Sequence, residues 1–269
     1  MLRNISLIAA GLICLVTFHN SQSAVINVPS SQAQTISEAM VIAQQGDTVW
    51  VESGVYRENV MLAPGVTLLS RSQFGAVIDG RGRGNVVTMA RGNRISGFEI
   101  RNGTIGIFSN GVGNDIIKNR IVNNWQSGII AIRHLPRIED NIIAFNGGSG
   151  IQGWDVRSTA ASINHNSIAY NENHGISIGG ESEVIIENNV VAHNVRFGLK
   201  ILRSEENVQI ISNNFFKNLY SPRPMPEGNY SFDPAFVSPR TRMNFESDPL
   251  LCCQTQSANN ENLGARLTY

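Results

Sequence analysis

The central part of the chain repeats one pattern of apolar and polar positions. An Ile lies three residues before an Asn, and an apolar residue lies two residues after it, in five copies that keep the same phase. Successive copies are separated by 22, 25, 23 and 24 residues. Apolar residues at such short spacing are typical of β-strands, in which alternate side chains share a face. The first Asn of each copy is Asn119, Asn141, Asn166, Asn189 or Asn213.

A second Asn completes each copy, and a Gly follows it in the first four. The second Asn comes five residues after the first, and a Gly followed by Ile or Leu begins another short apolar segment. Each copy therefore predicts about three strands separated by turns, too little to bury its own apolar face unless the copies stack. These positions are Asn124, Asn146, Asn171, Asn194 and Asn218, with Gly128, Gly150, Gly175 and Gly198.

We therefore predict an all-β fold, a single-stranded right-handed parallel β-helix. Each strand pairs with its copy one turn away, about 4.8 Å along the axis, and parallel connections of this kind are right-handed. The Ile residues then form one interior column, consisting of Ile116, Ile138, Ile163, Ile186 and Ile210. A helical solenoid is excluded because paired Asn and Gly in every copy would interrupt its helices. A leucine-rich repeat is excluded because its Leu positions are absent.

The first Asn of each copy has a predicted structural role. Asn tolerates the left-handed backbone of a sharp bend, and its amide can bond to the same amide one turn away. We expect residues 119–213 to contribute an interior Asn ladder at one corner. This predicts that loss of Asn166 destabilises the protein more than loss of Asn123.

The ends of the chain differ from the repeats. Residues 1–24 read as a signal peptide: Arg3 precedes a mostly apolar run that is too short for a membrane anchor, the alternative, and Ala24 follows small residues. Residues 25–65 are expected to form an N-terminal cap and first strands, with a short helix over residues 35–44 that Thr35 and Glu38 begin. That helix would cover the open end of the coil. Three prolines, from Pro222 to Pro226, end the coil, so that residues 66–219 form the β-helix and 220–269 an irregular tail.

Composition narrows the class of function. Lys+Arg and Asp+Glu are both 21, which argues against a protein built to hold nucleic acid. Cys252 and Cys253 are adjacent, so a disulfide between them would be strained, and no metal-ligand spacing accompanies them. We expect an exported monomer, periplasmic or extracellular, without a metal, a cofactor, a nucleic-acid partner or a membrane span after signal removal.

Several segments resemble a known superfamily. Gly46-Asp47-Thr48-Val49, Gly54-Val55-Tyr56-Arg57-Glu58 and Gly65-Val66-Thr67-Leu68 resemble the start of bacterial β-helix proteins. The Asn and Gly repeats resemble those of pectate-lyase-like proteins, and Phe232-Asp233-Pro234 and Ser247-Asp248-Pro249 resemble segments found after such domains. The resemblance implies the fold, but the superfamily includes lyases, hydrolases, epimerases and non-catalytic proteins.

One local match is to polygalacturonases. His174-Gly175-Ile176 resembles their histidine motif, and Gly198-Leu199-Lys200 lies one turn later, where that family has its Arg-x-Lys motif. The positions of the family's hydrolytic carboxylates hold Gly148-Ser149 and Gln126-Ser127 instead. Inverting hydrolysis needs two carboxyl groups about 6.5–9.5 Å apart, so the match is read as repeat chemistry.

The candidate site follows from the outward positions of one strand. The residue after each Gly-Ile points outward, and neighbouring turns align these positions. We expect Trp154 to stack on a sugar ring, Gln152, Arg133 and Arg203 to bind substrate, and His174 or Lys200 to move a proton while Asp155 sets its charge. The alternative is a solvated surface on which Trp154 packs a loop. A second outward row is expected to pack a loop or the tail: Asn123, Phe145, Tyr170, His193 and Lys217.

Two hypotheses of function follow. In the first, an exported β-helix protein binds an acidic polysaccharide and acts on it as a lyase, an epimerase or a glycoside hydrolase. In the second, a non-catalytic envelope or surface β-helix serves as a scaffold or accessory protein. The first requires convergent polar groups on one face, whereas the second requires only the ladder.

Overall fold

The computed structural model describes residues 23–157, 161–181, 183–203, 207–222, 224–234, 236 and 265. The first 22 residues of the predicted signal peptide lie outside the described residues, as do Cys252, Cys253 and the Ser247-Asp248-Pro249 segment. Among the described residues, no helix has the length and apolar character that crossing a membrane requires.

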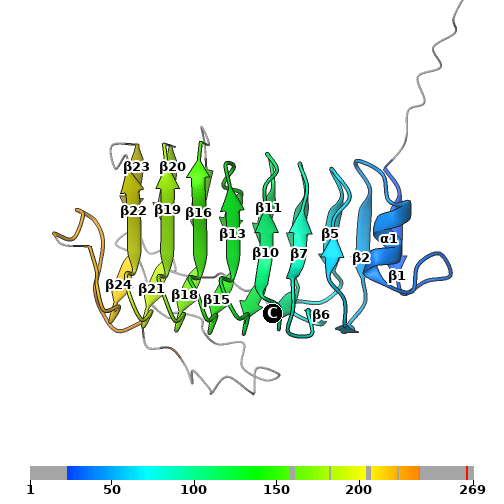
Figure 1. Cartoon of the computed structure of the whole chain (residues 1–269), viewed down its shortest axis with the longest axis horizontal. Coiled ribbons are helices and arrows are strands. Elements are labelled where there is room, and N and C mark those ends of the chain that lie inside the picture. The colour runs from blue at the N-terminus through cyan, green and yellow to red at the C-terminus, as the bar shows by residue number, and fades with distance from the viewer. Residues whose placement is uncertain are drawn as a thin grey trace, which may run out of the picture.

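The described chain forms three parallel sheets that run the length of a solenoid (Figure 1). Sheet A consists of β1 (Val25–Val28), β2 (Thr48–Val51), β5 (Thr67–Ser70), β8 (Arg94–Ser96), β11 (Asp115–Ile117), β14 (Arg137–Glu139), β17 (Ala161–Asn164), β20 (Val184–Glu187) and β23 (Val208–Ile211). Sheet B consists of β3 (Gly54–Tyr56), β6 (Ala76–Asp79), β9 (Glu99–Arg101), β12 (Arg120–Val122), β15 (Ile142–Ala144), β18 (Ser167–Ala169), β21 (Val190–Ala192) and β24 (Asn214–Phe216). Sheet C consists of β4 (Val60–Met61), β7 (Asn85–Met89), β10 (Ile105–Ser109), β13 (Ile129–Ile132), β16 (Ile151–Val156), β19 (Ile176–Gly180) and β22 (Leu199–Arg203). The predicted right-handed parallel β-helix is confirmed.

The predicted Ile column is confirmed by the register of sheet A. Ile116 pairs with Ile138, Ile138 with Ile163, Ile163 with Ile186, and Ile186 with Ile210. The first four are fully buried, while Ile210, in the last strand of the sheet, is partly buried against the same core. Stacking identical side chains turn upon turn removes their apolar surface from water along the whole axis.

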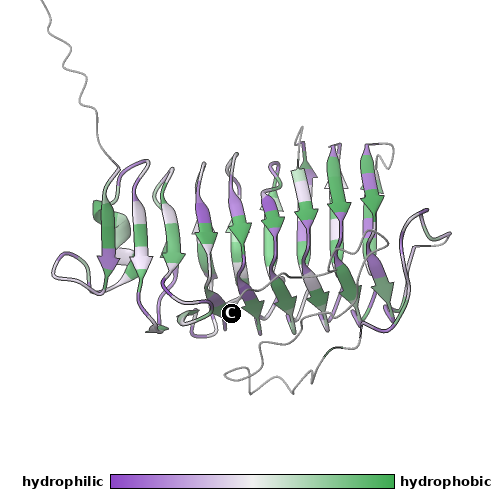
Figure 2. Cartoon of the chain, turned by 180° about the vertical axis from the view of Figure 1, so that it is seen from behind, coloured by the Kyte–Doolittle hydropathy of each residue, from purple (hydrophilic) through white to green (hydrophobic). Residues whose placement is uncertain are grey.

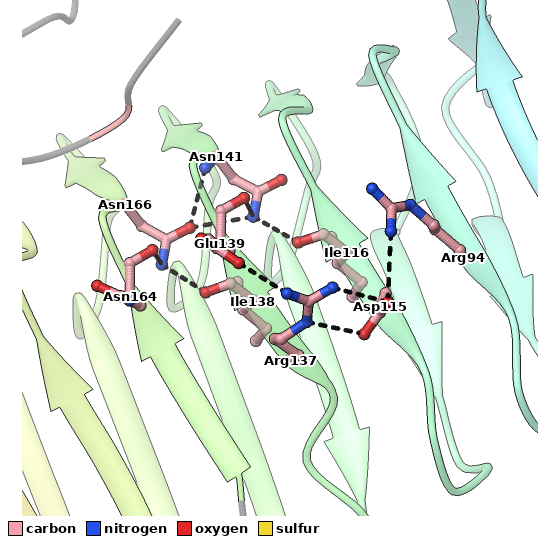
Figure 3. Close-up of polar contacts among 9 residues, drawn as sticks. All are labelled: Arg94, Asp115, Ile116, Arg137, Ile138, Glu139, Asn141, Asn164 and Asn166. Carbon is pink, nitrogen blue, oxygen red and sulfur yellow. Dashed lines mark hydrogen bonds and ion pairs between the residues drawn. The ribbon is translucent and has the colours of Figure 1, made fainter.

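The Asn ladder is present and longer than predicted. Asn166 Oδ1 accepts hydrogen bonds from the backbone and side-chain amides of Asn141, both at 3.0 Å, and the same arrangement recurs from Asn119 to Asn213 (Figure 3). Asn229 adds a further rung, since its Oδ1 accepts from Asn213 at 2.9 and 3.0 Å. The second Asn of each repeat forms a parallel ladder of its own, through Asn124, Asn146, Asn171, Asn194 and Asn218.

The predicted capping helix is α1 (Ile36–Ile42), which lies against the end of the solenoid beside β1 and β2 (Figure 1). Thr35 and Glu38 form the expected capping box. Glu58 adds two hydrogen bonds to the free backbone amides of the first turn, at 3.0 Å to Ile36 and 2.8 Å to Ser37. The buried residues of the helix, Ile36, Ala39 and Met40, join the core.

The outer faces of sheets A and B are occupied by the protein's own contacts. On sheet A, Arg137 makes a bidentate ion pair with Asp115 at 3.0 and 3.1 Å and reaches Glu139 at 3.0 Å (Figure 3). The strands β15, β18 and β21 of sheet B are largely apolar (Figure 2) and are buried on both sides.

The C-terminal part of the chain contributes to the cover of sheet B. Ala265 donates its backbone amide to Ser167 Oγ at 3.1 Å, and Phe236 lies 6.1 Å from Tyr170 and 6.3 Å from His193, measured between ring centroids. The prediction that the second outward row packs a loop or the tail is confirmed for Tyr170 and His193. Many outward residues of sheets A and B thus take part in internal contacts, and sheet C carries the predicted candidate row.

Candidate functional site

The strands of sheet C bring the predicted outward row together. Gln152 on β16 pairs in register with Ser177 on β19, and Ser177 pairs with Lys200 on β22. Upstream, the same row continues through Ile130 on β13 and Phe108 on β10. Neighbouring members of the row are therefore about 4.8 Å apart along the axis. The row changes from apolar to polar and then to cationic toward the C-terminal end.

A second row lies at the edge where the chain enters these strands. Ser127 donates to Gln152 Oε1 at 3.1 Å, so this edge row contacts the outward row. Ser149, on the next turn, is fully buried, and its hydroxyl has no hydrogen-bond partner within the described protein. His174 follows on the turn after that, with its backbone oxygen accepting from Gly150 at 2.9 Å. The edge thus carries a line of hydrogen-bonding side chains beside the outward row.

His174 is held as a neutral imidazole. Its Nδ1 accepts a hydrogen bond from the backbone amide of Phe197 at 3.3 Å, so the proton of the neutral ring is on Nε2. Burial lowers the pKa of His174, and the positive charges of Lys200 and Arg196 lower it further. The Phe197 ring contributes to this burial, with its centroid 5.4 Å from that of the imidazole. Lys200 Nζ lies 5.6 Å from the centroid of the same ring.

The lowered pKa of His174 predicts a pH dependence of stability. The pKa of His193 is lowered in the same way, by burial first and then by Lys217, which outweigh the opposing effect of Asp233. A histidine with a depressed folded-state pKa stabilises the fold fully above its unfolded pKa of about 6.5, and this contribution is lost as pH falls from there through the folded pKa. The melting temperature should therefore fall between about pH 7 and about pH 5. In thermal melts, the melting temperature of the double variant His174→Gln, His193→Gln should fall less over this pH range than that of the parent. An equal fall would contradict the lowered pKa values of the two histidines.

Trp154 and Asp155 lie at a bulge in β16. The pairing of β16 with β19 shifts register between Gly153 and Val156, and Asp155 has a left-handed φ of +47°. The bulge leaves the Trp154 side chain 54% exposed. The Asp155 carboxylate pairs with Arg157, with Oδ1 and Oδ2 both 3.1 Å from its guanidinium. β-Bulges commonly re-aim side chains at functional sites, and here the bulge presents an indole to solvent.

The other predicted residues are placed around this bulge. Arg133 is exposed, and its backbone amide donates to the Trp154 oxygen at 3.0 Å. The backbone of Arg203 pairs with Gly180, while its side chain lies outside the described part of the structure. Of the residues predicted to form one patch, the structure places Gln152, Trp154, His174 and Lys200 on three successive turns of sheet C. Arg133 lies one turn before them. The charges that act on His174 come from Lys200 and Arg196.

The sequence interpretation missed two aromatic residues of this face. Phe108 extends the outward row, and Tyr220 stacks on Phe197 with ring centroids 4.8 Å apart. Phe108 was identifiable, because Gly106-Ile107-Phe108 has the same form as Gly150-Ile151-Gln152. Tyr220 was not, since a proline-rich segment follows it and breaks the period.

The family model for NosD, described as periplasmic copper-binding protein, matches residues 39–233. This chain belongs to the NosD family. The family is periplasmic, which agrees with the predicted export, although the signal peptide itself remains a prediction. No curated protein sequence matches this NosD-family chain.

The comparison with solved structures found parallels to this NosD-family chain, among which pectate lyase Pel9A shares its fold. Pectate lyase Pel9A is 14% identical, with 91% of this chain and 96% of that chain covered and a TM-score of 0.50. The A-module of mannuronan C-5 epimerase AlgE4 from Azotobacter vinelandii is 18% identical, with coverage of 68% and 72% and a TM-score of 0.42. At these identities the likeness concerns the fold alone.

The copper in the family's description can be tested against the residues of this chain. Copper sites are built from imidazole, thiolate, thioether or carboxylate ligands that converge on one point. Within the described residues, no three His, Cys, Asp or Glu side chains lie close enough together to hold a metal ion. His174 and His193 illustrate this, because they lie on sheets C and B and face aromatic rings. The described part of this NosD-family chain therefore has no copper centre built from His, Cys, Asp and Glu.

Proposed function

We propose that this protein binds an extended anionic polysaccharide of the polyuronate class on the outer face of sheet C. The observation that carries the proposal is the arrangement of Trp154 and Gln152 on β16 and of Lys200 on β22, two turns apart on the outer face of sheet C. On sheet A, Arg137 pairs with Asp115 and Glu139, and the strands β15, β18 and β21 of sheet B are buried. Exposed aromatic surface beside a cation is the chemistry that sugar acids require.

The spacing of the face suits a polymer more than a small molecule. Gln152 and Lys200 are two turns apart, or about 10 Å along the axis, which is comparable to the reach of two sugar units. Trp154 would stack on one ring while Gln152 hydrogen-bonds its hydroxyls and Lys200 pairs with a neighbouring carboxylate. Because these contacts lie on a regular strand face, an extended ligand would meet the same geometry over several units.

His174 supports binding through its protonation state. With Nδ1 accepting from the Phe197 backbone, the neutral ring has a donor at Nε2. Burial and the nearby Lys200 keep the pKa of His174 below its usual value, so the ring is neutral at periplasmic pH near 7. A neutral donor beside a cationic Lys is suited to a sugar hydroxyl next to a carboxylate.

The proposal concerns binding, and turnover is a separate hypothesis. The set of residues that a hydrolase requires is incomplete here, because Asp155 pairs with Arg157 and the expected carboxylate positions hold Ser149 and Ser127. Proton abstraction, as in a lyase or an epimerase, requires no such pair, but it requires a base with a free lone pair, whereas His174 Nδ1 accepts from Phe197 and Lys200 is cationic. Copper has no part in the proposal, since the described residues have no copper centre built from His, Cys, Asp and Glu.

The test is affinity for polygalacturonate and polymannuronate, with dextran as the neutral control. The mature protein should bind the polyuronates, with an affinity that falls as salt rises. Trp154→Ala and Lys200→Ala should each weaken binding about tenfold, the equivalent of about 1.4 kcal/mol, without lowering the melting temperature. Assays for unsaturated products and reducing ends on the same samples test turnover.

Two variants on sheet A serve as matched controls. Arg94→Ala removes one exposed positive charge, and Ile185→Ala removes one exposed apolar side chain. Both should bind as the parent does, because they lie on another face. If the parent binds no polyuronate, or if the sheet A variants lose as much affinity as the sheet C variants, the proposal is wrong. The scaffold hypothesis then becomes the better one.

A further inference from the structure

We propose that Trp125, with Arg83 and Arg81, forms a second subsite for the same polymer. This inference rests on the proposed function, which it extends along the axis of the solenoid. Trp125 is the most exposed of the aromatic side chains in the described chain, at 74%. An exposed indole offers a flat apolar face on which a sugar ring can stack.

The turn that carries Trp125 is built to lay its ring on the protein surface. Trp125 lies just before β13, and its backbone amide donates to the oxygen of Gly103 on the preceding turn at 2.9 Å. Two turns back, a Cβ added at Gly82 would lie 4.0 Å from Trp125 Nε1. The indole therefore runs back along the axis toward Gly82, over turns that present glycine. Gly147 lies on the following turn, and a Cβ added there would overlap the backbone oxygen of Trp125.

Two arginines flank Gly82 and give this aromatic platform its charge. Arg81 and Arg83 are both exposed, and neither has an ion-pair partner among the contacts of the described residues. Their backbones are fixed: the Arg81 amide donates to Asp79 Oδ1 at 3.0 Å, and the Arg83 oxygen accepts from Asn59 Nδ2 at 3.0 Å. Asp79 does not neutralise them, because its carboxylate is held by Arg101 at 3.2 Å. An indole face next to a turn with two exposed arginines fits a uronate ring with its carboxylate.

The new subsite lies on the same sheet as the first. The turn with Gly82 enters β7 and the turn with Trp125 enters β13, and these strands belong to sheet C with β16 and β22 further along (Figure 1). The turn with Arg81 and Arg83 enters β7, five turns before Lys200 on β22, or about 24 Å along the axis, which is the reach of about five sugar units. A single polyuronate chain lying along sheet C would therefore contact Trp154 and Lys200 with one part and Trp125 with another.

The experiment is calorimetric titration with oligogalacturonates of two lengths, about three and about ten units, chosen from this spacing. The long oligomer should bind the parent more tightly than the short one. Trp125→Ala and Arg83→Gln should each lower the affinity for the long oligomer about tenfold and leave the affinity for the short oligomer unchanged. Trp154→Ala should lower the affinity for both oligomers. Trp125→Phe should retain most of the affinity, because it keeps an aromatic face. Arg83 is preferred to Arg81 because Arg81 has a φ of +56°, where substitution itself perturbs the backbone.

Each outcome is decisive. If the parent binds both oligomers and Trp125→Ala binds the long one as tightly as the parent, the second subsite is refuted while the proposed function stands. If Trp125→Ala lowers the affinity for the short oligomer as much as the affinity for the long one, Trp125 belongs to the first site, and the second subsite is again refuted. If the parent binds neither oligomer, the proposed function fails and the subsite fails with it.

Discussion

Replacement of Asn166 by alanine is expected to destabilise the fold by about 3 kcal/mol, because it leaves several buried groups without partners. Asn166 Nδ2 donates to the oxygens of Ile138 at 2.8 Å and Asn164 at 2.9 Å, and to Asn189 Oδ1 at 3.0 Å. Its Oδ1 accepts two hydrogen bonds from Asn141. The side chain is fully buried, so water cannot replace these bonds without entering the core.

Asn164→Ala is the matched control. Asn164 lies on β17, two residues before Asn166, and the bond it gives the ladder comes from its backbone oxygen, which alanine retains. Asn123, the comparison that the sequence first indicated, is less suitable because its φ of +56° makes alanine unfavourable there by about 1 kcal/mol. Thermal and urea unfolding should give a much lower midpoint for Asn166→Ala than for Asn164→Ala. Equal midpoints would mean that the ladder does not stabilise the protein.

The fold was predictable because the residues that face the interior recur at regular intervals along the chain. Each turn must place an apolar residue and an Asn at the same inward positions, so the phase of Ile138, Ile163 and their equivalents appears directly in the sequence. The rung at Asn229 was not predictable, because it follows Asn213 by only 16 residues. A shortened turn satisfies the same hydrogen bonds without keeping the period. Sequence spacing therefore identifies the regular turns, whereas the short turn that ends at Asn229 is identified only by its hydrogen bonds to Asn213.

The site was predictable as a row but not in its local geometry. Alternation along a strand places Gln152, Ser177 and Lys200 on the outer face, and the register confirms it. The bulge that exposes Trp154 depends on a left-handed residue at Asp155, and no periodic pattern specifies it. The neutral state of His174 likewise depends on Phe197, which supplies both the amide that Nδ1 accepts and part of the burial. Contacts between turns, rather than positions within a turn, set the chemistry of this face.

The repeated glycine is the least replaceable residue of each turn, and Gly175→Ala is expected to cost about 3 kcal/mol. A Cβ at Gly175 would overlap Val191 Cγ1 and would lie 2.8 Å from the Gly198 oxygen and 2.9 Å from Asn194 Nδ2. The last two atoms belong to the backbone and to the second Asn ladder, so neither can move without breaking hydrogen bonds between turns. The glycine is required by this close approach of neighbouring turns.

Gly179→Ala provides the control within the same segment of chain. Gly179 lies on β19, and an added Cβ would be 3.6 Å from Leu202 Cβ and 3.9 Å from the Gly153 oxygen, which are ordinary contacts. Because alanine restricts the unfolded chain more than glycine does, this variant should be neutral or more stable by up to about 1 kcal/mol. Urea unfolding of the two variants should separate them by several kcal/mol. If Gly175→Ala unfolds with the same midpoint as Gly179→Ala, the turns are not packed as closely as the ladder requires, and the repeated glycine would then reflect turn propensity alone.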